Sequence, residues 1–373
     1  MTGVLILHLF VMGLAMFFAS LGVKKNMRVS KSRLVMNAGY TAAFLLLFFF
    51  LASRVNLGRD WNNYMDLYRD CESTPFSFSE SFEFGFLFIM KFLKSLDADF
   101  QWFIIITSFI TVTLFFRAFR KIYCLLPFGI LIFFTQWAYP VVINTIRQGI
   151  AILAFLCAFS YVGESGPKAL LKYLAFILIG VLFHYTILLF IPVYWLGKMQ
   201  VNLKQLLLIT GAAYVLSFFL IMPLFNDVLA LFSKYTYSMD SYYSNSATFG
   251  FGAMTVLIAR LLPLVIFPYI KKKYPSFVKY YLLYYIGVAV NYAFLKYLMI
   301  VRVTFYLQFF ELVLMPLLLF LALRKKKKYG IYAVAFLVFS FIYYFYTFRS
   351  FIVDQAVSTD YSVMLMNFST RGI

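Results

Sequence analysis

Apolar runs of about 20 residues recur from one end of the sequence to the other, and a helix of that length crosses ~30 Å of hydrocarbon. Hydrophobic residues make up 64% of the 373 positions, and charged residues only 13%. Backbone amides have no water partner in lipid, and the runs lack the alternation of a β-barrel, so the spans must be helices. The sequence therefore predicts an all-α, polytopic integral membrane protein.

The charge distribution indicates which loops face the cytoplasm. Lys and Arg number 33 against 14 Asp and Glu, which gives a net charge of +19. In a soluble protein such an excess would suggest a nucleic-acid partner. Here the cations cluster in short loops between apolar runs, as in cytoplasmic loops, so we expect no nucleic acid. Part of the excess also suits anionic lipids or a pyrophosphate ligand.

Placing the basic loops inside predicts one membrane domain, residues 1–373, with about 11 to 12 membrane helical segments. Most acidic residues then fall in an external loop, 54–99. Within it, 82–96 is apolar but too short to span, which predicts an outer-face amphipathic or re-entrant helix. A second external loop is expected at 223–250, and an external C-terminal tail at 349–373.

Residues 169–197 decide the topology of the second half. If they form one helix, the basic runs Lys271–Lys273 and Arg324–Lys328 fall outside, against the positive-inside rule. A reversal near His184 brings every basic cluster inside. The sequence thus predicts a broken helical hairpin with His184 at its outer turn, an arrangement tolerated where helices line a cavity.

Two groups of candidate site residues lie in the first external loop. Asp60 stands among Arg59, Trp61 and Tyr64, and such aromatic rings and carboxylates suit carbohydrate recognition; an ordinary polar turn with interfacial aromatic residues is the alternative. Glu83 stands at the start of the amphipathic segment, where a helix dipole alone would also favour an acid.

A third group lies at the outer start of a later span. Asn144, Arg147 and Gln148 offer donors there, and an Arg at a helix start suits a phosphate better than a neutral ligand. The alternatives are a snorkelling Arg147 and a His184 that merely caps its turn.

Several charges lie deeper in the apolar runs, and none of them forms a metal motif. Arg260 and Glu311 are both mid-span, Arg302 flanks the span of Glu311, and either Arg could form a structural ion pair with Glu311. No His/Cys metal set exists, and Asp97-Ala98-Asp99 reads better as a helix cap than as a metal motif. We therefore expect no metal site.

The order of these short motifs resembles one known family. Gly58-x-Asp60-x-x-x-Tyr64, Glu83-x-Gly85-Phe86, Asn144-x-x-Arg147-Gln148 and Leu182-Phe183-His184-Tyr185-Thr186, with Arg302-x-x-x-Tyr306 and Pro316 later, resemble the Wzy/EpsG-type polysaccharide polymerase family. The resemblance covers most of 55–320. It implies a GT-C-like glycosyltransferase of the bacterial inner membrane with its active site facing the periplasm. Such enzymes transfer a glycan from undecaprenyl pyrophosphate onto a lipid-linked repeat unit, extending O-antigen or exopolysaccharide, and a chain-length regulator is an expected partner.

The resemblance also implies roles, which we state as hypotheses. Arg147, with Arg302, Arg260 and Arg59, would bind the pyrophosphate, and Asp60, Glu83 or His184 would accept the proton of the acceptor hydroxyl. Trp61, Tyr64, Asn144 and Gln148 would contact sugar. We expect a single displacement with inversion, without metal or cofactor, because a pyrophosphate leaving group needs no general acid.

Other classes of protein stay open at this point. A flippase or transporter of lipid-linked glycan would use broken helices and buried Arg residues, but transporters tend to hold coupling carboxylates at mid-membrane, where Glu311 is almost alone. A membrane ligase or an acyltransferase using His184 is a further alternative, and a structural scaffold is the last.

Overall fold

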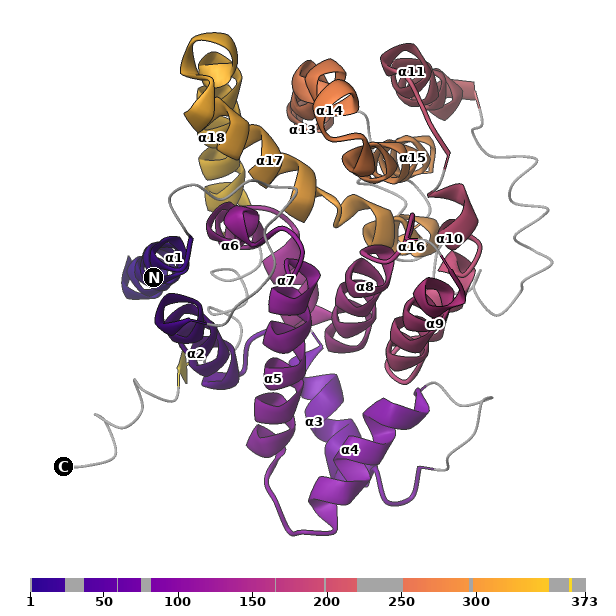
Figure 1. Cartoon of the computed structure of the whole chain (residues 1–373). Helices are drawn as coiled ribbons and strands as arrows, with labels where there is room; N and C mark the ends of the chain where they lie inside the picture. Colours follow the sequence, from indigo (N-terminus) through magenta and orange to yellow (C-terminus); the bar gives the residue numbers. More distant parts are fainter. Residues whose placement is uncertain are drawn as a thin grey trace.

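The computed structural model is an assembly of helices (Figure 1). It describes residues 2–23, 37–58, 60–74, 82–164, 166–197, 199–219, 251–294, 298–348 and 362–363. Large apolar side chains such as Phe10, Leu171 and Ile331 are exposed, whereas polar residues such as Thr107, Gln136 and Ser340 are buried. This inverted distribution fits a lipid environment, and the protein is a polytopic membrane protein.

The N-terminal half forms one packed group of helices. Helix α1 (Thr2–Leu21) packs on α2 (Ala38–Ala52) and on α6 (Leu126–Thr135), and α2 packs on α5 (Phe100–Ala118). His8 of α1 is fully buried, and its Nε2 lies 3.0 Å from the Tyr139 hydroxyl. This histidine therefore has a packing and hydrogen-bonding role inside the bundle.

Two short helices project from one end of the bundle (Figure 1). They are α3 (Trp61–Asp70) and α4 (Phe84–Lys94), and α4 occupies most of the amphipathic segment predicted at 82–96. One face of α4 is buried, and the other carries a ladder of stacked rings, Phe84, Phe88 and Phe92, with centroids 6.0 and 6.2 Å apart. The ladder is exposed along its whole length.

The strand β1 (Arg54–Val55) pairs in antiparallel register with β2 (Ser362–Val363), so Arg54 faces Val363. Residues 362–363 of the C-terminal tail thus lie beside the start of the first predicted external loop. The second predicted external loop, 223–250, the remainder of the tail and Arg59 lie outside the described residues.

The central helices α8 (Ile146–Phe159) and α9 (Pro167–Val181) pack side by side, and the chain reverses after α9. A 3-10 helix, η3 (Tyr185–Phe190), and α10 (Val193–Leu196) fold back on α9, because the Tyr173 hydroxyl donates to the carbonyl of Phe190 at 2.5 Å. His184 lies at the break. The helix break predicted within 169–197 is therefore present.

The C-terminal half surrounds one sealed helix. α17 (Glu311–Arg324) is buried from Glu311 to Ala322 and packs against α6, α15 (Val278–Ala293) and α18 (Lys326–Phe348). The other elements of this half are α11 (Leu203–Phe219), α13 (Phe251–Leu261), η5 (Leu262–Ile266), α14 (Phe267–Lys273), η6 (Pro275–Phe277) and α16 (Leu298–Gln308). In the N-terminal half, η2 (Tyr123–Leu125) precedes α6 and α7 (Ala138–Asn144) follows it.

The described part of the chain combines long apolar helices with shorter and bent ones. Within the described residues, 4 helices are long and apolar enough to cross a membrane, or 5 if the bent pair of η2–α6 and α7 counts as one span. That pair bends by 65°. Proline explains a further division, because Pro263 and Pro268 stand where the run after Phe251 breaks into α13, η5 and α14.

Candidate active site

Glu83 lies at the centre of a charged group joined from three separate segments. Its Oε2 accepts a hydrogen bond from Arg147 at 2.7 Å, and its Oε1 lies 2.7 Å from Nδ1 of His184. An ionised carboxylate can only accept, so Nδ1 carries the proton of the imidazole. The Glu83 side chain is 5% exposed, whereas those of Arg147 and His184 are 23% and 24% exposed. The carboxylate is thus a buried bridge between two groups that a ligand can reach.

The pKa of Glu83 lies below its ordinary value. Burial opposes ionisation of this carboxyl, but the hydrogen bond from His184 and the charge of Arg147 outweigh burial and hold the pKa down. Glu83 is therefore ionised at neutral pH with both oxygens engaged. This arrangement makes it a weak proton acceptor and a strong orienting group.

Glycine allows the three segments to meet. Glu83 is the N-cap residue of α4, and a Cβ at Gly85 would lie 2.6 Å from the Cβ of Leu182 and 2.8 Å from its carbonyl oxygen. The backbone N–H of Phe86 donates to that same carbonyl at 3.1 Å. The start of α4 therefore sits directly on the end of α9, two residues before His184.

Arg147 is fixed by aromatic groups as well as by Glu83. Its guanidinium lies 4.9 Å from the ring centroid of Phe82 and 5.6 Å from that of Phe86. It also hydrogen-bonds with the hydroxyl of Tyr64 on α3. Burial raises the pKa of Tyr64 to about 12, so this phenol stays protonated. These contacts fix the guanidinium of Arg147 inside the protein, whereas a snorkelling arginine would extend to the lipid headgroups.

Asp60 belongs to the same neighbourhood. It is half-buried at the N-cap position of α3 and acts electrostatically on Tyr64. Gly58, just before it, has a φ of 112°, and a Cβ there would lie 2.9 Å from the carbonyl oxygen of Ile143. The turn that carries Asp60 therefore packs on the end of α7, where Asn144 is the last residue.

Helix α16 supports the site from behind. The side-chain amide of Gln148 donates to the backbone carbonyl of Arg302 at 2.8 Å, so this predicted sugar ligand ties α8 to α16. Arg302 itself is exposed. One turn on, the buried Tyr306 hydroxyl lies 3.0 Å from Oγ1 of Thr186 and is close enough to feel the charge of Glu83. The Thr186–Tyr306 pair and the Phe82 ring had no role assigned from sequence, although Thr186 and Tyr306 belong to the quoted motifs.

Trp61 lies in the packed interior. It is 7% exposed, and its ring meets Phe100 edge-on at 5.2 Å. In this conformation the indole packs α3 against the start of α5 and offers little surface to a sugar.

Arg260 lies in a different cluster from Arg147. Its guanidinium is 5.9 Å from the ring centroid of Tyr292, its backbone carbonyl accepts from Tyr285, and it interacts electrostatically with Glu311. Both Arg260 and Glu311 are buried, and within the described residues no direct ion pair joins them. The structure thus separates two arginines to which the sequence assigned one role.

The Asp97–Asp99 segment has the helix-capping role predicted for it. The Asp99 side chain accepts from the backbone N–H of Gln101 at 2.9 Å, at the start of α5. Over the described ranges, no group of three or more His, Cys, Asp or Glu side chains is placed to hold a metal ion.

A comparison with known protein families gives a match over most of the chain. No curated protein and no solved structure matches the chain significantly. A family model matches residues 37–360, which include every candidate residue described above. The chain therefore belongs to the EpsG family and is, in general terms, a membrane polysaccharide polymerase.

Proposed function

We propose that this protein extends a surface polysaccharide by transferring a glycan from undecaprenyl pyrophosphate to a lipid-linked repeat unit. The observation that carries the proposal is the bridge in which Glu83 holds Arg147 on one oxygen and His184 on the other. The bridge sets a fixed cation beside an oriented imidazole. Those are the two groups that glycosyl transfer from a pyrophosphate requires.

Arg147 serves the leaving group. As the bond between the anomeric carbon and the pyrophosphate oxygen breaks, the electron pair remains on that oxygen, and negative charge grows there. A guanidinium held in place by Glu83 and Tyr64 stabilises this charge without reorganising during the reaction. Arg302, exposed on α16 beside Gln148, is the second cation that we assign to the pyrophosphate.

His184 serves the acceptor. Its Nδ1–H is bound to Glu83, so its Nε2 is the nitrogen that takes the proton from the attacking hydroxyl. The acceptor oxygen bonds to the anomeric carbon as the pyrophosphate leaves, which inverts that carbon in a single displacement without a metal or cofactor. Glu83 stabilises the imidazolium that results. This assignment selects one of the three candidate bases, Asp60, Glu83 and His184, that the sequence left open.

The lipid part of the substrate has a suitable surface next to the charged group. The ladder Phe84, Phe88 and Phe92 begins one residue after Glu83 and is exposed along α4. A donor with its pyrophosphate at Arg147 can lay its polyprenyl chain against these rings. We propose that this side of the protein faces the periplasm, because the basic loops indicate that the opposite side is cytoplasmic.

The test uses cells that lack the native gene and carry Arg147→Ala, His184→Ala or the wild type, with expression matched. Surface polysaccharide is resolved on a gel. We expect the ladder of chain lengths to collapse to single repeat units in both variants. An unchanged ladder in Arg147→Ala would refute the site.

The same gel tests the transporter alternative, in which the buried Glu311 would be the coupling carboxylate. If no repeat unit reaches the surface in the variants, export has failed and the transporter function gains support. Single repeat units at the surface support polymerisation.

A further inference from the structure

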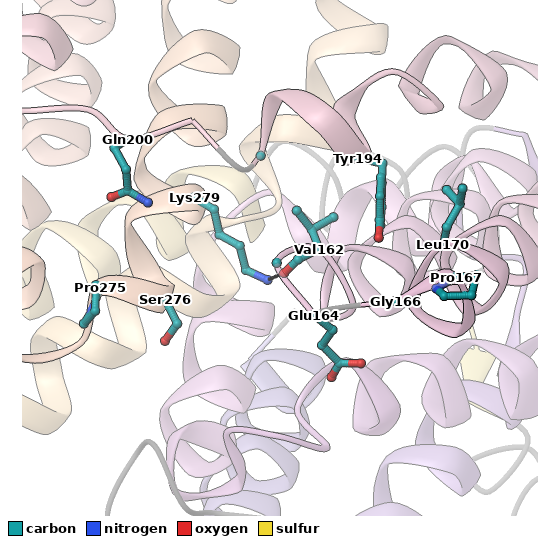
Figure 2. Close-up of a pocket in the computed structure, with 12 residues that line it drawn as sticks. Val162, Glu164, Gly166, Pro167, Leu170, Tyr194, Gln200, Pro275, Ser276 and Lys279 are labelled. Atoms are coloured by element: carbon teal, nitrogen blue, oxygen red, sulfur yellow. Dashed lines mark hydrogen bonds between the residues drawn. The ribbon is translucent and has the colours of Figure 1, made fainter.

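A cavity lies at the far end of the two helices that carry the site. It measures about 800 Å³ and is lined by the turn between α8 and α9, by α10 and by the start of α15. Figure 2 shows the main polar side chains around it, Glu164, Tyr194, Ser276 and Lys279. Arg147 stands at the opposite end of α8, about 20 Å away at 1.5 Å per residue. The cavity is therefore separate from the Glu83 group.

Lys279 is the cation inside this cavity. Its ammonium reaches across from α15 and donates to the carbonyl of Val162 in the turn after α8 (Figure 2). It also donates to the carbonyl of Phe159, the last residue of α8, at 3.1 Å. These carbonyls explain the position of the side chain, since a helix C-terminus attracts cations. They carry no net charge, however, and an ammonium has three donors. The half-buried cation is therefore positioned but not neutralised by them.

One carboxylate, that of Glu164, is the negative charge that acts on Lys279 within the described residues. The charged groups that act on it within the described residues are Lys121 and Glu164, and Glu164 is already paired with Lys121. Arg117, Lys121 and Lys172 all contact Tyr161 in the same turn. Glu164 is the only carboxylate in the sequence between Asp99 and Asp227. A single carboxylate thus faces a group of cations, and an anion in the cavity would correct the imbalance.

We propose that this cavity binds a phosphate-bearing ligand through Lys279. A phosphate oxygen would take the remaining donor of the ammonium, and the hydroxyls of Ser276 and Tyr194, which also line the cavity, can donate to the other oxygens. The ligand chemistry is shared by two sources, the headgroup of an anionic lipid and a soluble phosphate compound. Either would clamp the α8–α9 turn to the start of α15.

The experiment measures thermal unfolding of the purified full-length protein in nanodiscs. An Arg147→Ala, Arg302→Ala background removes both cations that we assign to the pyrophosphate, so that any phosphate effect comes from elsewhere. One arm adds inorganic phosphate to phosphatidylcholine nanodiscs, with ionic strength held constant by chloride. The other arm replaces part of the phosphatidylcholine by phosphatidylglycerol. Each arm compares the background with added Lys279→Met, with Lys272→Met as the matched control, an exposed lysine on α14.

We expect at least one arm to raise the Tm, and Lys279→Met to weaken the apparent affinity about tenfold while Lys272→Met keeps it. A shift with inorganic phosphate assigns a soluble ligand, and a shift with phosphatidylglycerol alone assigns a lipid headgroup. Ser276→Phe fills the cavity and should abolish the shift, which decides the matter if Lys279→Met fails to fold. The proposal is overturned if neither arm raises the Tm, or if the cavity variants keep the full shift.

Discussion

The Glu83 group and the Arg260–Glu311 cluster contain the same two residue types but differ in every physical respect. In the first, three segments meet, the ion pair is direct at 2.7 Å, and its cation is partly exposed. In the second, both charges are sealed among tyrosines, without direct contact. A ligand can reach the first without unfolding anything. A charge at membrane depth therefore indicates a site only when other side chains fix it in place and a ligand can reach it.

The largest expected effect is on activity at the first cluster. Glu83→Ala leaves His184 unoriented and Arg147 without its partner, so polymer formation should fall by about 10²-fold or more. Glu311→Gln, the matched change in the second cluster, should leave the ladder of chain lengths nearly intact. Gel analysis at equal expression checks both. Equal losses in the two variants would erase the functional distinction between the clusters.

The Arg260–Glu311 cluster should affect the stability of the protein more than its activity. Glu311→Leu removes the carboxylate that acts on the buried Arg260, which should lower the free energy of unfolding by about 2 kcal/mol. Adding Arg260→Met should recover most of the loss, because apolar residues replace both charges. Denaturation in detergent measures the two variants. No recovery in the double variant would mean that Arg260 has a further role.

Acid should weaken the first cluster in a defined direction. The folded-state pKa of Glu83 is lowered, so its stabilising contribution is complete above the unfolded value of about 4.3 and is lost as pH falls from there through the folded-state pKa. Unfolding measured from pH 6 down to pH 3 should show this loss, and Glu83→Gln should flatten it. An equally steep acid loss in Glu83→Gln would assign it to other carboxyls.

Tyr64→Phe should give the smallest effect. It removes one hydrogen bond to Arg147 but keeps the ring that packs on Phe86 at 5.5 Å. We expect a loss of about 1 kcal/mol in stability and a several-fold lower rate of polymer formation. A loss as large as that of Glu83→Ala would place the phenol in the reaction itself.

The sequence predicted the membrane class, the break at His184 and the identities of Glu83, Arg147 and His184 as candidates. The break was predicted from the distribution of Lys and Arg, because only a reversal of the chain there places every basic loop on the cytoplasmic side. The bridge itself could not be predicted, because its three members are brought together by the close approach at Gly85. The separation of Arg260 from Arg147 could not be predicted either, because an apolar run indicates how deep a residue lies in the membrane but not which helices pack against each other. Nor could the burial of Trp61 be predicted: its residue type suits a sugar, but its packing depends on Phe100.

The pairing of β1 with β2 has a consequence for how the protein is made. Arg54 and Val55 leave the ribosome early, but their partners, Ser362 and Val363, are translated at the other end of the chain. Arg54 and Val55 therefore cannot pair until a segment translated long after Glu83, Arg147 and His184 has been made. A chain released before Ser362 would contain those three site residues, yet lack this pairing.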